Sequence, residues 1–289
     1  ISIGIQANFG ADTESNNLSI GQAALGSSVA GGETNVAVGN LSLDALTSAS
    51  DNIAMGYQAG TDITTGGKNT MLGSLVFRNA TTAAENVIIG YLAGGAQAAT
   101  SGYNVVIGNE AAEEMTSMSE ATIVGYKAAT SNTTGSNILA MGYQAYDAAD
   151  TENHNLAIGT HALGGAVAGG ESNVAIGNYS LDALTSADAC TAVGYQSGSA
   201  ITTGANNVLM GYNVGASITT GANNTFFGHQ AGDGFDTESH NLGIGVNALG
   251  GAVAGGEYNA AIGNYALDAL TSGDENLAIG YDAGSGITE

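Results

Sequence analysis

The pentapeptide Asn155-Leu156-Ala157-Ile158-Gly159 recurs almost unchanged at residues 173–177 and 276–280. Its closing glycine, here called the anchor glycine, returns every 17 or 18 residues from Gly4 to Gly280, giving 17 anchor glycines in 289 residues. Positions are counted from it, so Gly159 is position 0 and Ile158 is position −1. A fixed period of this length is typical of a solenoid, in which each coil packs mainly on its neighbours. We therefore expect about 17 coils in one continuous domain over residues 1–289, as a fragment of a longer fibrous protein.

The composition agrees with a stack of β-coils. The chain has 46 Gly, which suit tight corners with positive φ, and no Pro, so every backbone N–H can join a ladder. Hydrophobic residues make up 44%, too many for a disordered Gly-rich linker. No helical period or heptad is visible, so we predict an all-β protein built as a parallel β-solenoid.

The charge is strongly negative and excludes two classes of partner. Twenty-six acids face three cations, Lys68, Arg78 and Lys127, giving a formal net charge of −23. Binding to nucleic acid or to an anionic membrane needs clustered Lys and Arg, so we expect neither. No apolar segment is long enough to insert into a membrane. Because self-repulsion at this charge is better tolerated in salt, we expect a saline or divalent-rich environment outside the cell.

The strand pattern lies just before each anchor glycine. Position −1 is apolar in every coil and position −3 is mostly Val, Leu or Ile, and alternate residues share one face of a strand. Further apolar residues follow at +3 or +4, such as Leu163, and at +7 or +8, such as Leu184. We interpret the coil as a flattened two-strand roll with positions −3 and −1 facing a thin interior.

Position −2 would then face outward, yet it is apolar. No charged residue occupies positions −3 to −1 in any coil. A strand that is apolar on both faces is buried on both faces, so we expect other copies of the chain to cover this side, as a homotrimer or, less favoured, a dimer. The predicted interchain packing residues are Ala37, Ala54, Ala140, Ala157, Ala175, Ala192, Ala261 and Ala278.

Position −4 is Asn in most coils, and an Asn repeated at one position can form a stacked amide ladder. The predicted ladder consists of Asn17, Asn35, Asn52, Asn69, Asn86, Asn104, Asn155, Asn173, Asn207, Asn224, Asn241, Asn259 and Asn276. Its exceptions are Ala121, Ile138 and Cys190. Cys190 is the one cysteine, and we interpret it as a small buried residue rather than a reactive thiol.

Two further patterns concern the surface. Position +1 is Tyr in seven coils, which predicts an exposed or half-exposed row with edge packing or, less favoured, sugar contact. Residues 155–200 match residues 241–286 at an offset of 86, whereas residues 65–140 diverge and hold all three cations. If any part of the surface is specialised, we expect it in this divergent block.

The chain has no legible catalytic arrangement, and we expect no enzyme activity, no cofactor and no dedicated metal site. The four His follow repeat positions, as His154 and His240 do. The acidic clusters at residues 12–14, 150–152 and 236–238 leave weak Ca²⁺ binding open, although neither the β-roll nor the EF-hand calcium motif is present. Ile-Thr-Thr-Gly at 63–66, 201–204 and 218–221 is too irregular to favour ice binding.

The repeated Asn-x-Ala-Ile-Gly, followed by segments such as Tyr-Gln-Ala-Gly at 57–60, resembles the head repeats of trimeric autotransporter adhesins and related repeats of phage tail fibres. The resemblance covers essentially the whole chain. It implies a left-handed β-roll, three chains around one axis, attachment to a surface, and an extracellular location on a bacterial cell surface or in a virion tail fibre. The period of 17–18 residues exceeds the 14 or 15 usual for the adhesin heads, so the corners are expected to be longer.

We therefore expect a non-enzymatic, trimeric fibre segment that attaches to a cell-surface receptor or glycan through its corners, by multivalent display. The rival interpretation is a purely structural spacer whose binding tip lies elsewhere. A third, a polysaccharide-cleaving fibre enzyme, requires acids that converge in a groove. The sequence does not choose between a bacterial and a viral origin.

Overall fold

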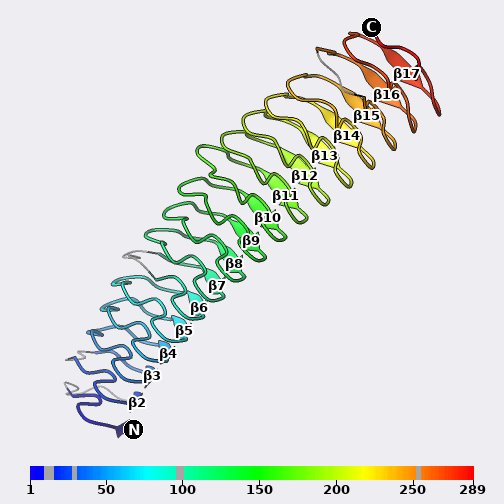
Figure 1. Cartoon of the computed structure of the whole chain (residues 1–289). Coiled ribbons are helices and arrows are strands. Elements are labelled where there is room, and N and C mark those ends of the chain that lie inside the picture. Colours follow the sequence, from blue (N-terminus) through cyan, green and yellow to red (C-terminus); the bar gives the residue numbers. More distant parts are fainter. Residues whose placement is uncertain (10–15, 28–30, 96–100, 252–254) are drawn as a thin grey trace. The chain divides into compact units, whose positions relative to one another are not determined.

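A computed structural model describes residues 1–9, 16–27, 31–95, 101–251 and 255–289. Within these ranges the protein is all-β, with short parallel strands and no helix (Figure 1). Each coil contributes one strand immediately before its anchor glycine, followed by a long turn segment. The prediction of a parallel β-solenoid is confirmed. No helix in the described ranges is long and apolar enough to cross a membrane.

The chain divides into two compact units, Ile1–Tyr143 and Gln144–Glu289, which have the same coil architecture. The prediction of one continuous domain therefore stays a prediction. The first unit contains β1 (Ser2–Ile3), β2 (Leu18–Ile20), β3 (Val36–Val38), β4 (Ile53–Met55), β5 (Thr70–Leu72), β6 (Val87–Ile89), β7 (Val105–Ile107), β8 (Thr122–Val124) and β9 (Leu139–Met141). The second contains β10 (Leu156–Ile158), β11 (Val174–Ile176), β12 (Thr191–Val193), β13 (Val208–Met210), β14 (Thr225–Phe227), β15 (Leu242–Ile244), β16 (Ala260–Ile262) and β17 (Leu277–Ile279).

Within each unit, neighbouring strands pair in strict repeat register. Ala157 in β10 lies opposite Ala175 in β11, and Ala175 lies opposite Ala192 in β12. The insertion that makes some coils 18 residues long is therefore absorbed outside the strand. Equivalent positions stack directly above one another, so each position of the repeat forms a row along the unit.

The anchor glycine closes the strand for two physical reasons. Gly159 has φ +136°, a conformation that side chains rarely adopt. A Cβ built on it would also lie 2.6 Å from the carbonyl oxygen of Gly177 in the next coil. Equivalent close approaches recur along both units, as at Gly21 and Gly245, so the period of the sequence reflects a steric requirement.

The far wall of the coil differs from the predicted second strand. In the described ranges it consists of turns and bends, with isolated bridges joining Ala84, Gly102 and Ser119. Positions +2 and +4 have positive φ in coil after coil, for example 51° at His161 and 49° at Leu163. Residues in this left-handed conformation turn the chain at every second step and cannot continue a strand. The two-strand roll is therefore wrong in its second strand.

The strand faces are the reverse of the prediction. Position −2 is buried inside the coil, whereas positions −3 and −1 point outward and are half-buried or exposed. The interior is completed by apolar side chains from the turn segment, such as Phe235, whose ring centroid lies 5.3 Å from that of Phe226 at position −2.

The predicted interchain packing residues therefore belong to the core of their own chain, and their assignment to an interchain face is wrong. They are Ala37, Ala54, Ala140, Ala157, Ala175, Ala192 and Ala261, each 0% exposed, and Ala278, which is 7% exposed. These alanines line the interior of their own coils, where other coils place larger buried side chains such as Met71 and Phe226 at the same position.

Candidate functional surfaces

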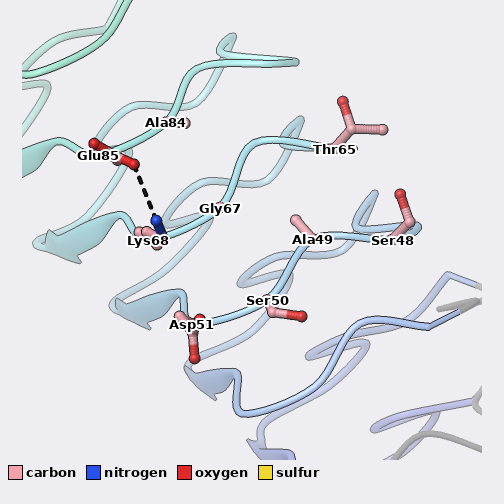
Figure 2. A pocket seen from close by; sticks show the side chains of 9 residues that line it. All are labelled: Ser48, Ala49, Ser50, Asp51, Thr65, Gly67, Lys68, Ala84 and Glu85. Atoms are coloured by element: carbon pink, nitrogen blue, oxygen red, sulfur yellow. Dashed lines mark hydrogen bonds and ion pairs between the residues drawn. The ribbon is translucent and has the colours of Figure 1, made fainter.

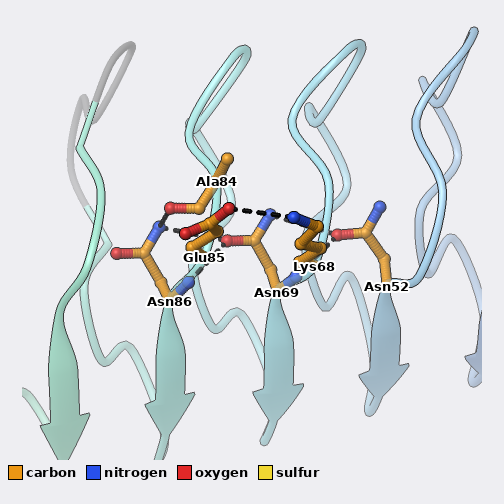
Figure 3. Close-up of polar contacts among 6 residues, drawn as sticks. All are labelled: Asn52, Lys68, Asn69, Ala84, Glu85 and Asn86. Atoms are coloured by element: carbon orange, nitrogen blue, oxygen red, sulfur yellow. Dashed lines mark hydrogen bonds and ion pairs between the residues drawn. The ribbon is translucent and has the colours of Figure 1, made fainter.

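The Asn row at position −4 forms the predicted ladder, at the start of the strands (Figure 3). The backbone N–H and side-chain Nδ2 of Asn69 both donate to Oδ1 of Asn52, at 3.0 and 3.1 Å. The same Nδ2 donates to the carbonyl of Ala83 at 2.8 Å. Each such bond is worth about 1 kcal/mol net, and the ladder repeats it in coil after coil.

Every predicted ladder residue takes part in bonds of this kind, from Asn17, which accepts from Asn35, to Asn276, which donates to Asn259. Most of these side chains are fully buried and hydrogen-bonded. The ladder is therefore structural and offers no free group to a ligand.

Two of the three exceptions to the ladder, Ile138 and Cys190, are accommodated locally. Asn155 follows the coil of Ile138, and its Nδ2 donates instead to the Tyr146 hydroxyl at 2.9 Å. That hydroxyl donates to the carbonyl of Glu152 at 3.1 Å, and burial raises the pKa of Tyr146 above its usual range. Tyr146 is the largest fully buried side chain, so an aromatic residue occupies the space and the hydrogen bond of a missing amide.

Cys190 is fully buried, as predicted, and its Sγ lies 3.2 Å from the carbonyl oxygen of Gly204. Burial raises the pKa of its thiol, so the reactive thiolate form is disfavoured. The thiol therefore acts as a small packing group that takes part of the place of an amide.

A threonine row at position +8 forms a second, less regular ladder. The hydroxyls of Thr185 and Thr202 donate to the carbonyls of Thr202 and Thr219, at 3.0 and 3.1 Å. Thr64 donates to Thr81 in the same way, at 3.0 Å. These hydroxyls satisfy the backbone of the next coil, so they are not displayed as a free array for ice.

Two of the acidic clusters contain a buried glutamate. Glu152 and Glu238 are 4% and 5% exposed. Oε2 of Glu152 accepts the backbone N–H groups of Asp150 and Thr151, at 3.0 and 3.1 Å, and Oε1 accepts that of Gly169 in the next coil, at 2.9 Å.

Glu238 repeats this arrangement and reaches the N–H of Gly255 at 2.9 Å. Both carboxylates therefore have backbone donors as partners at a corner. The third cluster, residues 12–14, lies outside the described residues. Weak Ca²⁺ binding at the exposed acids stays a prediction.

Positions −3 and −1 of all coils, which we call the outward strand face, carry no charge. No Asp, Glu, Lys or Arg occupies positions −4 to +1 in any coil, although the chain holds 29 charged residues elsewhere. The face is mostly aliphatic, with Thr at position −3 of four coils and Phe227 at position −1, and its side chains are half-buried or exposed, such as Met55 at 45%, Ile176 at 37% and Ile244 at 39%.

An aromatic row borders the outward strand face. The predicted Tyr residues at +1 are 40–76% exposed, which confirms an exposed or half-exposed row. In the second unit the rings of Tyr195, Tyr212 and His229 stack in succession, with centroids 5.3 and 5.2 Å apart and interplanar angles of 15° and 6°. Because these rings cover one another's faces, the row presents mainly edges and hydroxyls, which weakens the interpretation as a sugar platform.

An open hollow of about 350 Å³ lies in the first unit, at the start of the divergent block (Figure 2). It is lined by Ser48, Ala49, Ser50, Asp51, Thr65, Gly67, Lys68, Ala84 and Glu85. The Lys68 ammonium pairs with the Glu85 carboxylate at 3.1 Å, and this hydrogen bond raises the pKa of Lys68. The lining is therefore polar and carries both signs of charge.

The sequence did not identify this hollow, although it lies partly in the block that we expected to be specialised. Its signals were the local divergence and the presence of Lys68. A second cation, Lys127, pairs with Glu110 of the preceding coil at 3.2 Å, whereas Glu85 lies in the coil after Lys68. Two of the three cations therefore neutralise an acid at the same position of a neighbouring coil.

None of the described residues forms a cluster of three or more His, Cys, Asp or Glu side chains that could hold a metal ion. Comparisons with protein-family models, with curated proteins and with solved structures found no match. The protein is therefore classed by its fold alone, as a parallel β-solenoid with a charge-free outward strand face.

Proposed function

We propose that this chain is a non-enzymatic segment of a homotrimeric surface fibre that attaches to a cell-surface receptor or glycan. The observation that carries the proposal is the outward strand face, because it is mostly aliphatic, half-buried or exposed, and free of charge in a chain with net charge −23. Charge depletion around exposed aliphatic and aromatic residues is typical of the centre of a protein interface.

A second copy of the same chain is the partner that fits this face best. The side chains repeat at the spacing of the coils, so only a surface with the same spacing can pack against them along their whole length. The acidic remainder of the chain would repel another acidic chain everywhere except at the charge-free face. Three chains fit better than two, because a cyclic trimer joins two different patches, here the aliphatic face and the Tyr row, whereas a dimer joins identical ones.

The resemblance to adhesin head repeats supports the same assembly and a left-handed coil. The trimer would place three copies of every corner around one axis, so weak contacts at the corners would add up by effective concentration. A structural spacer remains the second candidate, favoured by the close match of residues 155–200 with 241–286.

The native mass, measured by light scattering at low and high salt, tests the assembly. We expect a trimer for the parent chain and a folded species of lower mass for Ile176→Glu, which adds a charge to the outward strand face. Thr203→Glu is the matched control, since Thr203 is exposed in the turn segment of the neighbouring coil. A monomeric parent chain, or an Ile176→Glu variant that remains trimeric, would contradict the proposal.

Attachment is tested separately by binding of the trimer to cells after substitutions at exposed corner positions. Loss of binding at a cluster of corners supports attachment. Insensitivity of binding to every corner substitution would favour the spacer.

A further inference from the structure

Beside the hollow, whose lining runs from Ser48 to Glu85, lies an aromatic side chain, Tyr103, that takes no part in the stacked aromatic rows. Tyr103 occupies position −5, as do Asp51, Lys68 and Glu85 in the three preceding coils. All four residues have nearly the same left-handed backbone, with φ between 60° and 61°, so their side chains leave the backbone in the same direction. Tyr103 is 64% exposed, the most exposed tyrosine apart from Tyr281 in the last coil.

The backbone fixes the order of these side chains along the unit. The N–H groups of Lys68 and Glu85 donate to the carbonyls of Ser50 and Gly67, each at 3.0 Å. Gly102, next to Tyr103, forms a bridge with Ala84, next to Glu85. Asp51, Lys68, Glu85 and Tyr103 therefore follow one another at successive coil spacings of about 4.8 Å each, and the Lys68 ammonium interacts electrostatically with Tyr103.

The ring of Tyr103 has no aromatic partner among the described residues, in contrast to the equivalent residue of the second unit. Tyr258 also occupies position −5 and has φ 59°, yet its ring stacks on that of His240 with centroids 4.9 Å apart. The ring of Tyr103 is thus exposed one coil beyond Glu85, whose carboxylate lines the hollow (Figure 2).

We propose that Tyr103 and the hollow form a binding site for a neutral oligosaccharide. The exposed ring of Tyr103 suits the C–H surface of a sugar ring. Carboxylates accept hydrogen bonds from the hydroxyl groups of a sugar, and protein hydroxyls both accept and donate them. The row from Asp51 to Tyr103 spans three coil spacings, the length of a short oligosaccharide. An anionic ligand is disfavoured, because Glu85 already neutralises Lys68 and the rest of the chain is strongly negative.

The inference deepens the proposed attachment function by naming its ligand class, but its test does not depend on cells or on assembly. Saturation-transfer NMR and calorimetry with the full chain would use short oligosaccharides of glucose, galactose, mannose and N-acetylglucosamine as probes. We expect at least one probe to bind. Tyr103→Ala should raise the dissociation constant of that probe by at least about ten-fold, equivalent to 1.4 kcal/mol. Glu85→Gln should also weaken the binding of that probe, and the native mass of both variants should be unchanged.

Tyr258→Ala is the matched control and should leave binding unchanged, because its ring face is covered. Absence of binding by every probe, equal binding by the Tyr103→Ala variant, or a preference for sialylated probes would overturn the site. If the sugar site fails while the chain is trimeric and binds cells, the proposed function stands. If the chain is monomeric yet binds a sugar through Tyr103, the proposed assembly fails and the site stands.

Discussion

At the scale of single residues, position −2 shows how narrow the interior is. Ala157 is fully buried within its own coil, between Ala175 in the next strand and apolar residues of the turn segment. A carboxylate placed there could reach neither water nor a cation, since no charged residue occupies the neighbouring strand positions.

Ala157→Glu should therefore lower the free energy of unfolding by more than about 4 kcal/mol, through the buried charge and the added volume. Urea unfolding followed by circular dichroism measures the loss, with Thr203→Glu as the surface control. Because the side chain lies inside its own chain, the variant should be destabilised even as a monomer. A variant with an unfolding midpoint close to that of the parent would show that position −2 is not interior.

Cys190 is a residue at which the repeat is imperfect and can be improved. The ladder already reaches this position, since Oδ1 of Asn173 accepts the Cys190 N–H at 2.9 Å. The thiol stands where an amide oxygen would accept from Asn207, and the carbonyl of Gly204 is within its reach.

Cys190→Asn should raise the free energy of unfolding by about 1 kcal/mol, because it continues the ladder from Asn173 to Asn207 with side chains of a size that the neighbouring coils accept. Differential scanning calorimetry checks the gain. Cys190→Ala, which removes the thiol and adds no amide, should not be more stable than the parent. A destabilised Cys190→Asn variant would indicate that this coil is packed differently from its neighbours.

At the scale of the coil, the sequence predicted the period and the Asn ladder because both depend on one residue type at one position. It did not predict which strand face is inside. Alternation shows that Leu156 and Ile158 share a face, but both faces are apolar here, and only the fit of Ala157 into a thin interior decides between them. The second wall was missed because left-handed Leu163 and Leu181, each with φ 49°, violate ordinary backbone preferences and are held by their neighbours.

The candidate sugar site was less accessible from sequence than the fold. Tyr103 and Tyr258 share a repeat position, and their difference lies in the neighbouring side chain, since only Tyr258 stacks on a histidine. The divergence of residues 65–140 indicated the region, but the exposure of the Tyr103 ring depends on its neighbours in the fold, which sequence alone does not show.

The corner at Glu152 joins two coils and gives the third prediction. Its carboxylate accepts backbone N–H groups on both oxygens, including that of Gly169, which belongs to an 18-residue coil. An amide group would place a donor against one of these donors and leave both without a partner.

Glu152→Gln should therefore lower the free energy of unfolding by about 1–3 kcal/mol, and Glu238→Gln should have the same effect at the equivalent corner. Glu171→Gln is the control, because Glu171 is exposed. Chemical denaturation of the three variants makes the comparison. Equal stabilities of all three would show that the buried carboxylates do not hold the corners.

At the scale of the whole molecule, the dominant feature is an excess of 23 negative charges on a chain whose coils are stacked closely. Four aspartates on the turn segments are also partly buried, which disfavours their charged form. Burial raises the pKa of Asp44, Asp147, Asp182 and Asp233 above the ordinary value of 3.8. For Asp147 and Asp182, His161 partly opposes this effect.

Because these pKa values are higher in the folded chain than in the unfolded one, the folded chain binds more protons as the pH falls from neutral towards 3.8. Protonation in this window therefore stabilises the fold, and the gain is lost again as the pH rises through the folded pKa values. Loss of negative charge relieves self-repulsion in the same direction.

We expect the Tm to be higher at about pH 5 than at about pH 7, at constant ionic strength. In an Asp147→Asn, Asp182→Asn double variant, whose side chains stay neutral, the difference in Tm between the two pH values should be smaller. A Tm that falls steadily on acidification would mean that favourable interactions of the ionised carboxylates outweigh their burial and mutual repulsion.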